Sequence, residues 1–321
     1  MIELFKKIRW INLLIIVFTM YAMRFAVVSP LLKLNGLELQ LNDFYFVLLV
    51  LATVFLAAGG YIVNDYFDKK IDEINRPIKT KKELGDKEEE TICCKKAMKF
   101  YNAFTITGVV LGSLVSLLIG QYMFSTIFFL VAGVLWFYSS TYKRIPFLGN
   151  IIVAVLSALV PLLVVVYEMP LIIEKYRTLF IENDTDVMII MYFVGGFSAF
   201  AFFLTLIREI VKDIEDVLGD KAYGKNTIPV ILGNSFATVL AGIFIVVTVY
   251  MLFYYQTNYS NEKLSFWYIL LLIVSPLMYV VFRLIANTSK KGMHITSTII
   301  KLVMFFGIAY SFIIYSSLVT Q

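Results

Sequence analysis

The chain has 321 residues, of which 60% are hydrophobic and 16% are charged. Soluble domains have roughly 45–50% apolar and about 25% charged residues, so this composition excludes a soluble globular protein and indicates an integral membrane protein. The formal net charge of +5 does not indicate nucleic acid as a partner. A membrane protein needs basic residues in its inside loops, where anionic membrane lipids attract them.

Apolar segments of about 20 residues, the length that crosses a bilayer as a helix, recur along the whole chain. In chain order these nine expected spans are residues 10–31, 44–63, 99–119, 122–140, 147–167, 188–207, 229–253, 266–285 and 298–318. The first is too long for a removable signal peptide, so we expect it to remain as a membrane helix. The sequence therefore predicts an all-α polytopic membrane protein, with residues 1–321 forming a single domain.

The basic residues gather on one side of the expected spans. Most of the 28 Lys and Arg residues precede the first span or follow the second, fourth, sixth and eighth spans. Because cytoplasmic loops carry an excess of Lys and Arg, we expect the N-terminus and these loops to be cytoplasmic and the C-terminus to lie outside. Arg24, in the first span, is nearer the outside, and its side chain is expected to extend to the headgroups there.

The second span ends on the inside with NDYFDKKID, residues 64–72. If the helix continues, each residue advances about 100° around the axis. One face of that helix would then carry four polar side chains: Asn64, Asp65, Asp68 and Asp72.

The sixth span is followed by REIVKDIEDVLGD, residues 208–220, and on a continuous helix Asp213, Asp216 and Asp220 would also share one face. Two carboxylates about 6 Å apart repel by roughly 3 kcal/mol at an effective dielectric near 20. Cations relieve such repulsion, and Mg²⁺ is usually held by carboxylates, waters and substrate phosphates. The two clusters together predict a site for a divalent metal and a pyrophosphate group. For either cluster alone, a solvated face with i, i+4 pairs is the alternative.

At these residues the chain resembles the UbiA superfamily of intramembrane prenyltransferases. NDYFDKKID is similar to the family's NDxxDxxxD motif, INRP at 74–77 to its usual continuation, and DIEDVLGD at 213–220 to its second, DxxDxxxD-type motif. The resemblance covers nearly the whole chain, and it implies nine membrane helices in a ring around a central cavity.

The resemblance also implies a reaction. An allylic isoprenoid diphosphate binds between the two motifs with Mg²⁺, pyrophosphate departs, and a lipophilic acceptor captures the allylic carbocation. This chemistry suits a metal, which stabilises the charge that develops on the leaving group. It also suits a closed cavity, which keeps water from the cation.

The resemblance assigns roles to individual residues. The implied catalytic residues are Asp65, Asp68, Asp72, Asp213, Asp216 and Asp220. The implied metal ligands are Asn64, Asp68, Asp72, Asp213, Asp216 and Asp220. The expected substrate contacts are Asn12, Asn64, Arg76, Tyr138, Tyr142, Lys143, Arg208, Lys212 and Lys301.

The reasons differ among these substrate contacts. WFYSSTYKRIPFLGN, residues 136–150, is similar to the family's tyrosine and lysine segment, and RWIN, residues 9–12, to the start of its first helix. Lys301 lies in an apolar stretch, and an intramembrane charge is a functional hypothesis by default, with extension to the headgroups as the alternative. The three remaining cations flank the acidic clusters, where they would either bind phosphate or neutralise aspartate.

The second motif looks most like the branch of the family that uses geranylgeranylglyceryl phosphate as acceptor and geranylgeranyl diphosphate as donor. The acceptor's phosphate would give Arg76 and Lys301 a partner. The chain departs from that branch in its long charged segment 78–99 and in Leu218. An aromatic-acceptor prenyltransferase of quinone synthesis, acting on 4-hydroxybenzoate or dihydroxynaphthoate, is therefore the nearest alternative.

A cation transporter is the alternative from another class, because transporters also use intramembrane carboxylates. Transporters place their sites near the membrane midplane, whereas the acidic residues here lie at the inside ends of spans. Other enzyme classes find no support in the sequence. It has one histidine, His294, and it lacks a His/Cys metal set, a serine triad, a P-loop and the DGxxAR element of CDP-alcohol phosphotransferases.

Overall fold

The structure is a computed structural model, and it describes residues 9–75, 87–182, 188–259, 262–286 and 289–319. Side chains are described over the same ranges except residues 70–75, 87–94, 181–182 and 259. These ranges contain helices and turns and no β-strand. Within them, nine helical segments are long and apolar enough to cross a membrane. The prediction of an all-α polytopic membrane protein is therefore confirmed.

The contacts within the chain divide it into two units. Unit 1 comprises Met1–Val17, Asn42–Ile152 and Asp216–Ile231, and unit 2 comprises Phe18–Leu41, Val153–Glu215 and Leu232–Gln321. The long helices α2 (Trp10–Ala22), α8 (Leu148–Lys175) and α12 (Ile228–Tyr259) each begin in unit 1 and continue into unit 2.

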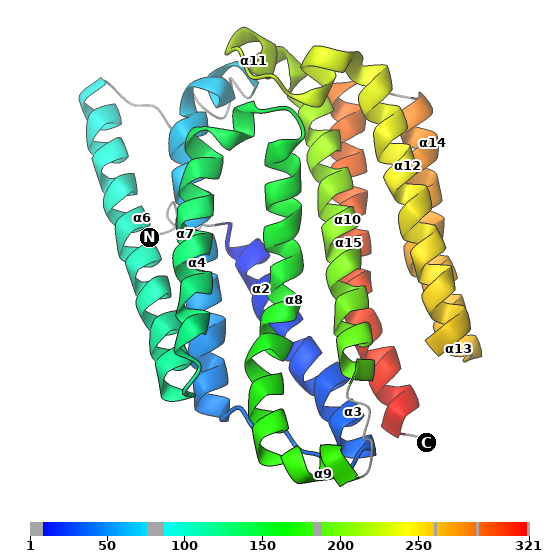
Figure 1. The fold of residues 1–321 in the computed structure, drawn as a ribbon. Coiled ribbons are helices and arrows are strands. Elements are labelled where there is room, and N and C mark those ends of the chain that lie inside the picture. The colour runs from blue at the N-terminus through cyan, green and yellow to red at the C-terminus, as the bar shows by residue number, and fades with distance from the viewer. Residues whose placement is uncertain (1–8, 76–86, 183–187, 260–261, 287–288, 320–321) are drawn as a thin grey trace. The chain divides into compact units, whose positions relative to one another are not determined.

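Unit 1 is built on three long consecutive helices that pack side by side (Figure 1). These three helices are α4 (Asp43–Asn75), α6 (Lys87–Leu118) and α7 (Ser125–Ser140). The unit also contains the short α11 (Val217–Ala222) and 3₁₀ turns at Tyr122–Phe124 and Tyr142–Arg144. A Cβ on Gly108 of α6 would lie only 2.9 Å from the carbonyl oxygen of Ala52 on α4. This glycine therefore lets the two backbones approach closely, as small residues do between membrane helices.

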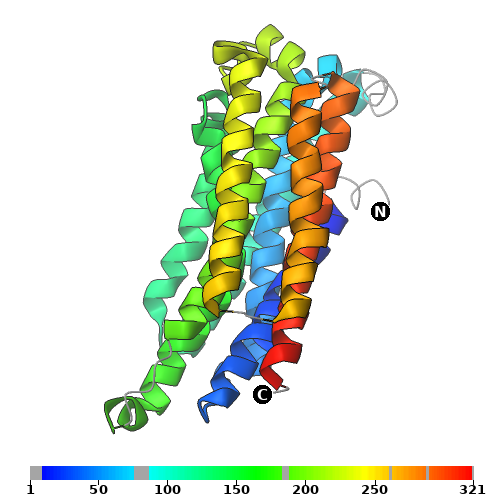
Figure 2. The same cartoon turned by 90° about the vertical axis from the view of Figure 1, so that its right-hand side faces the viewer.

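Unit 2 contains two antiparallel long helices, α10 and α15, that pack along each other, and Figure 2 shows α14 beside α15. Helix α10 comprises Met188–Glu215, α14 comprises Ser275–Ala286 and α15 comprises Lys290–Val319. The unit also contains α3 (Ser29–Leu34), α9 (Arg177–Glu182) and α13 (Lys263–Tyr268), and π-helical turns at Met23–Val28 and Ile269–Val274 join α2 to α3 and α13 to α14. Buried Ser265 of α13 donates to Gln256 Oε1 at 2.7 Å and also bonds the Tyr310 hydroxyl. Such polar contacts hold helices together where the hydrophobic effect contributes little.

Arg24 and Glu168 are charged side chains buried among the described residues of unit 2, and Arg24 contradicts the sequence expectation. Arg24 is 1% exposed and donates through Nη2 to the carbonyl oxygen of Leu41, so the prediction that it reaches the headgroups is wrong. Glu168 is also 1% exposed and accepts the backbone N–H groups of Gln40 and Leu41. The segment between α3 and α4 has no regular secondary structure, and these two side chains satisfy backbone groups of Gln40 and Leu41 there.

Candidate active site

The end of α4 carries the first acidic motif. The helix continues through Asn75, as the sequence predicts, and Asn64 Nδ2 donates to Asp68 Oδ2 at 3.0 Å. This i, i+4 contact confirms that the two side chains share a face. Asp72 lies on the same helix, but its side chain is outside the described residues, and Arg76 is outside them altogether.

Two lysines from distant parts of unit 1 meet this face. Lys143 Nζ donates to Asn64 Oδ1 at 3.1 Å and forms an ion pair with Asp68 Oδ2. Lys225 Nζ lies 3.4 Å from Asp68 Oδ1 and 3.4 Å from Asp220 Oδ1. We call these five residues, Asn64, Asp68, Lys143, Asp220 and Lys225, the carboxylate–lysine cluster. It joins the first acidic motif to the last aspartate of the second.

The turn after α11 explains how Lys225 comes to lie beside Asp220. Gly224 has φ +66°, a left-handed conformation that glycine adopts without a steric penalty. Its N–H donates to the carbonyl oxygen of Lys221 at 3.3 Å, and the N–H of Lys225 donates to the carbonyl oxygen of Asp220 at 2.9 Å. This is the Schellman pattern that closes helix C-termini, and it fixes Lys225 directly after the left-handed residue.

A second backbone contact joins the two lysine-bearing turns. Asn226 donates its N–H to the carbonyl oxygen of Arg144 at 3.2 Å. Arg144 follows Lys143 in the 3₁₀ turn after α7, and Asn226 follows Lys225. The backbones of the two turns therefore position both ammonium groups together.

The cluster is largely shielded from solvent. The side chains of Lys225, Asp220 and Asp68 are 6%, 5% and 13% exposed. Burial raises the pKa of the Asp220 carboxyl above its usual value, although the ammonium groups of Lys225 and Lys143 favour its ionised form. Two carboxylates and one amide oxygen are ligands that suit Mg²⁺, and two ammonium groups suit a diphosphate. The residues present therefore fit both partners that the sequence predicts.

Sequence reasoning did not single out Lys225 or Arg9 as site residues. Arg9 Nη2 donates to Asp65 Oδ1 at 2.8 Å, and its guanidinium carbon lies 5.1 Å from the centre of the Tyr61 ring. Both basic residues had a sufficient explanation in membrane topology. The sequence signals for them are the RWIN similarity, which contains Arg9 as well as Asn12, and the glycine that precedes Lys225.

The second acidic motif is not one continuous helix. Helix α10 ends at Glu215, Asp216 has φ −101° and ψ 8°, and α11 begins at Val217. The prediction that Asp213, Asp216 and Asp220 lie on one helical face is therefore wrong. Aspartate is unfavourable inside helices and common just before them, which fits a break at Asp216. Asp213 belongs to unit 2, and Asp216 and Asp220 belong to unit 1.

Two predicted substrate contacts in unit 2 share one carboxylate. Arg208 Nη1 and Lys212 Nζ lie 3.0 Å and 2.6 Å from Glu209 Oε1 on α10. Arg208 is 14% exposed, and its buried Nε has no hydrogen-bond partner among the described residues. This group of three carries a net positive charge, as a phosphate site would.

The remaining predicted substrate contacts among the described residues are Asn12, Tyr138, Tyr142 and Lys301. Asn12, Tyr138 and Tyr142 are half-buried, and the Tyr142 ring packs against Phe137 with centroids 6.0 Å apart. Lys301 is exposed on α15. Leu218, one of the departures from the family pattern, is 75% exposed, so its identity does not affect core packing.

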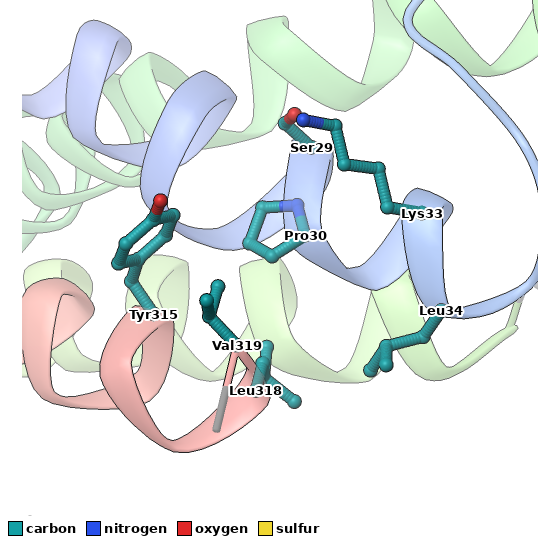
Figure 3. Close-up of a pocket in the computed structure, with 7 residues that line it drawn as sticks. All are labelled: Ser29, Pro30, Lys33, Leu34, Tyr315, Leu318 and Val319. Atoms are coloured by element: carbon teal, nitrogen blue, oxygen red, sulfur yellow. The ribbon is translucent and has the colours of Figure 1, made fainter. Parts of the chain in front are cut away.

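Figure 3 shows a cavity in unit 2 that the sequence did not indicate. It measures about 190 Å³ and is lined by Ser29, Pro30, Lys33, Leu34, Tyr315, Leu318 and Val319. The Lys33 side chain extends back toward Ser29 in this view. None of the lining residues is acidic, so this cavity lacks the ligands that the predicted metal needs.

Comparisons with known proteins identify the family of the chain. The model of the UbiA prenyltransferase family matches residues 13–308. The digeranylgeranylglyceryl phosphate synthase of Methanosphaera stadtmanae is 31% identical over 268 residues, which cover 81% of this chain and 84% of that protein. The protein of the same name from Thermococcus gammatolerans is 30% identical over 274 residues, covering 83% and 85%.

Solved structures share the fold. A structure from work on digeranylgeranylglyceryl phosphate synthase in membranes gives a TM-score of 0.63 at 21% identity, covering 96% of this chain and 97% of that one. A UbiA homologue from Archaeoglobus fulgidus bound to GPP and Mg²⁺ gives a TM-score of 0.59 at 16% identity, covering 98% and 99%. The extent of the family match and the identity to its named relatives lead to one conclusion: this chain is a member of the UbiA prenyltransferase family.

Proposed function

We propose that the protein transfers a geranylgeranyl group from geranylgeranyl diphosphate to geranylgeranylglyceryl phosphate, with loss of pyrophosphate. The observation that carries this proposal is the carboxylate–lysine cluster, in which ligands for Mg²⁺ and for a diphosphate converge in one buried place. The identity to synthases named for this product supports the choice of donor and acceptor.

In the reaction, the bond between C1 of the allylic chain and the diphosphate oxygen breaks, and the oxygen keeps the electron pair. The acceptor's hydroxyl oxygen then bonds to C1 and releases its proton. Lys143 and Lys225 would bind the departing pyrophosphate, since an ammonium group is a strong donor to phosphate oxygens. Burial of the cluster excludes water, which would otherwise capture the allylic cation.

Mg²⁺ would be held by Asn64, Asp68 and Asp220, and when bound it would supply charge stabilisation for the leaving pyrophosphate. Asp213 on α10, Asp216 and Asp72 remain predicted ligands from the sequence. Among the described residues, no group of three or more His, Cys, Asp or Glu side chains lies close enough together to hold a metal by itself. The amide of Asn64 and the substrate's own oxygens would therefore complete the ligand set.

The acceptor's phosphate needs cations of its own. Arg208 and Lys212 are the residues we propose for it, because Arg208 Nε is buried without a hydrogen-bond partner among the described residues and Lys212 lies beside the same Glu209 carboxylate on α10. Lys301 and Arg76 remain predicted contacts. An aromatic acceptor would make less use of these cations.

The protein is an integral membrane protein by its nine apolar helical segments in the described part of the chain. We propose that the whole chain works as one prenyltransferase domain, a view supported by the single family match over residues 13–308. The distribution of Lys and Arg supports a cytoplasmic N-terminus and an outside C-terminus.

A product assay tests the proposal. Purified protein in detergent would receive geranylgeranyl diphosphate and, in parallel, geranylgeranylglyceryl phosphate or 4-hydroxybenzoate, with Mg²⁺ or with EDTA. We expect Mg²⁺-dependent product from the glycerol phosphate lipid alone, and little product from Asp68→Asn. Product from the aromatic acid alone would move the protein to quinone synthesis. Asp68-dependent cation uptake into liposomes, without any prenylated product, would support a transporter instead.

A further inference from the structure

Lys225 connects the two acidic motifs through one ammonium group. Its Nζ lies at 3.4 Å from both Asp68 Oδ1 of α4 and Asp220 Oδ1 of α11. The side chain is 6% exposed, and the Schellman turn at Gly224 holds its backbone. A lysine that served only membrane topology would need neither burial nor two carboxylate partners.

The formal charges of the five residues in the carboxylate–lysine cluster cancel. Asp68 and Asp220 carry two negative charges, and Lys143 and Lys225 carry two positive ones. Buried carboxylates brought together without a cation repel strongly, and an uncompensated buried charge is strongly destabilising. The two lysines therefore neutralise the carboxylates in the free protein, and they occupy the oxygens that a divalent cation would need.

Substrate binding changes this balance. A diphosphate carries more negative charge than one carboxylate and offers several oxygens to an ammonium group. Lysine has a flexible stem and three donors that rotate freely, so Lys225 can change partners without a movement of its backbone. Any shift of Lys225 toward phosphate exposes oxygens of Asp68 and Asp220.

We propose that Lys225 exchanges partners when substrate binds. Its ammonium group moves from the two carboxylates to the diphosphate, and the carboxylate oxygens become free for Mg²⁺. This inference rests on the proposed function and deepens it. Lys225 is a positioning residue for Asp68 and Asp220 in the free protein and a diphosphate ligand in the complex. Metal and diphosphate then strengthen each other's binding, since linkage between two ligands is reciprocal.

The exchange predicts that removing the Lys225 ammonium group changes the affinities for a metal ion and for pyrophosphate in opposite directions. Loss of a purely structural lysine would not do so. The test uses purified full-length protein in detergent, wild type and Lys225→Gln. Binding of Mn²⁺ alone is measured by electron paramagnetic resonance of the free ion, and binding of inorganic pyrophosphate in EDTA by calorimetry. In Lys225→Gln we expect Mn²⁺ to bind about fivefold more tightly and pyrophosphate about tenfold more weakly, typical of gaining or losing one charged contact.

Two variants control for charge and for chemistry. Lys221→Gln removes one positive charge from an exposed position of α11, so it should change either affinity by less than about twofold. Lys225→Arg keeps the charge, so Mn²⁺ alone should bind as weakly as in wild type. If Lys225→Gln does not fold, Asp220→Asn gives the complementary test. It releases Lys225 from one carboxylate, so pyrophosphate in EDTA should bind about threefold more tightly.

The outcomes separate this inference from the proposed function. Tighter Mn²⁺ with weaker pyrophosphate in Lys225→Gln supports the exchange. If wild type binds both probes and Lys225→Gln either loses both affinities or changes neither, the exchange is overturned and the proposed function stands. Wild type that binds neither probe overturns the proposed function, and the inference with it.

Discussion

Arg9 Nη2 lies 2.8 Å from Asp65 Oδ1, and this ion pair separates Asp65 from its neighbours in the same motif. Asp68, one helical turn further along α4, faces Lys143 and Lys225. The two aspartates therefore have different partners although they belong to one motif. Asp65 is 33% exposed and Asp68 is 13% exposed.

We therefore predict that the two aspartates differ in their effect on catalysis. Asp68→Asn should lower kcat/KM by about 10²–10³, the usual loss for a buried group that stabilises transition-state charge. Asp65→Asn should lower it only about twofold, because its largely solvent-accessible pair with Arg9 contributes roughly 0.5 kcal/mol. Steady-state kinetics of both variants at saturating Mg²⁺ make the comparison. Equal losses would show that Asp65 takes part in metal or substrate binding.

Gly224 provides a second prediction, because its left-handed backbone places Lys225. Gly224→Ala puts a side chain at φ +66°, which costs about 1–2 kcal/mol, and relaxation of the turn would displace Lys225. Pyrophosphate affinity should then fall at least about threefold. Gly120→Ala is the matched control, since Gly120 has φ +76° in unit 1 and open space around it. A similar loss of affinity in both variants would contradict the role of the turn.

The fold was largely predictable because one physical property determines it. Lipid requires every backbone polar group to be satisfied within a helix, so long apolar segments such as 44–63 and 188–207 lie within helices. Hydropathy gives no information about side chains that reach from one element to another. Arg24 and Glu168 are buried with backbone partners on the segment before Asn42. No pattern in the sequence indicates that these side chains bind that segment.

The site was predictable only where its spacing is local. Asn64 and Asp68 are four residues apart on a helix, so their contact follows from helical geometry. Lys225 meets Asp68 through a turn, and a break at Asp216 precedes that turn. A helical projection carried through Asp216 therefore gave the wrong face for Asp220. Loop residues often carry function because loops are not bound to a repeating geometry.

Glu168 leads to a prediction about stability. It accepts two backbone N–H groups, those of Gln40 and Leu41, and Glu168→Ala leaves both without this acceptor in a buried position. We expect a loss of about 2–6 kcal/mol in the free energy of unfolding, at about 1–3 kcal/mol for each unsatisfied group. Unfolding in mixed detergent and dodecyl sulfate micelles measures it. Glu174→Ala on the same helix is exposed and should change stability by less than about 0.5 kcal/mol.

Arg208 gives the prediction that separates a phosphorylated acceptor from an aromatic one. The guanidinium of Arg208 bonds Glu209 through Nη1, and its buried Nε has no hydrogen-bond partner among the described residues. A phosphate oxygen would satisfy that donor, and loss of a charged hydrogen bond weakens binding by about 1.5–3 kcal/mol. Arg208→Gln should therefore raise KM for geranylgeranylglyceryl phosphate at least about tenfold, while the affinity for geranylgeranyl diphosphate stays within about twofold.

A control is needed for the change in local charge, because Arg208→Gln also removes a cationic partner of Glu209. Glu209→Gln tests that effect. It leaves Arg208 and Lys212 in place and removes their shared carboxylate, so the phosphorylated acceptor should bind at least as tightly as in wild type. If Arg208→Gln weakens donor binding and acceptor binding alike, the arginine belongs to the diphosphate site. If it weakens only the acceptor, α10 supplies the cation that distinguishes a glycerol phosphate lipid from an aromatic acid.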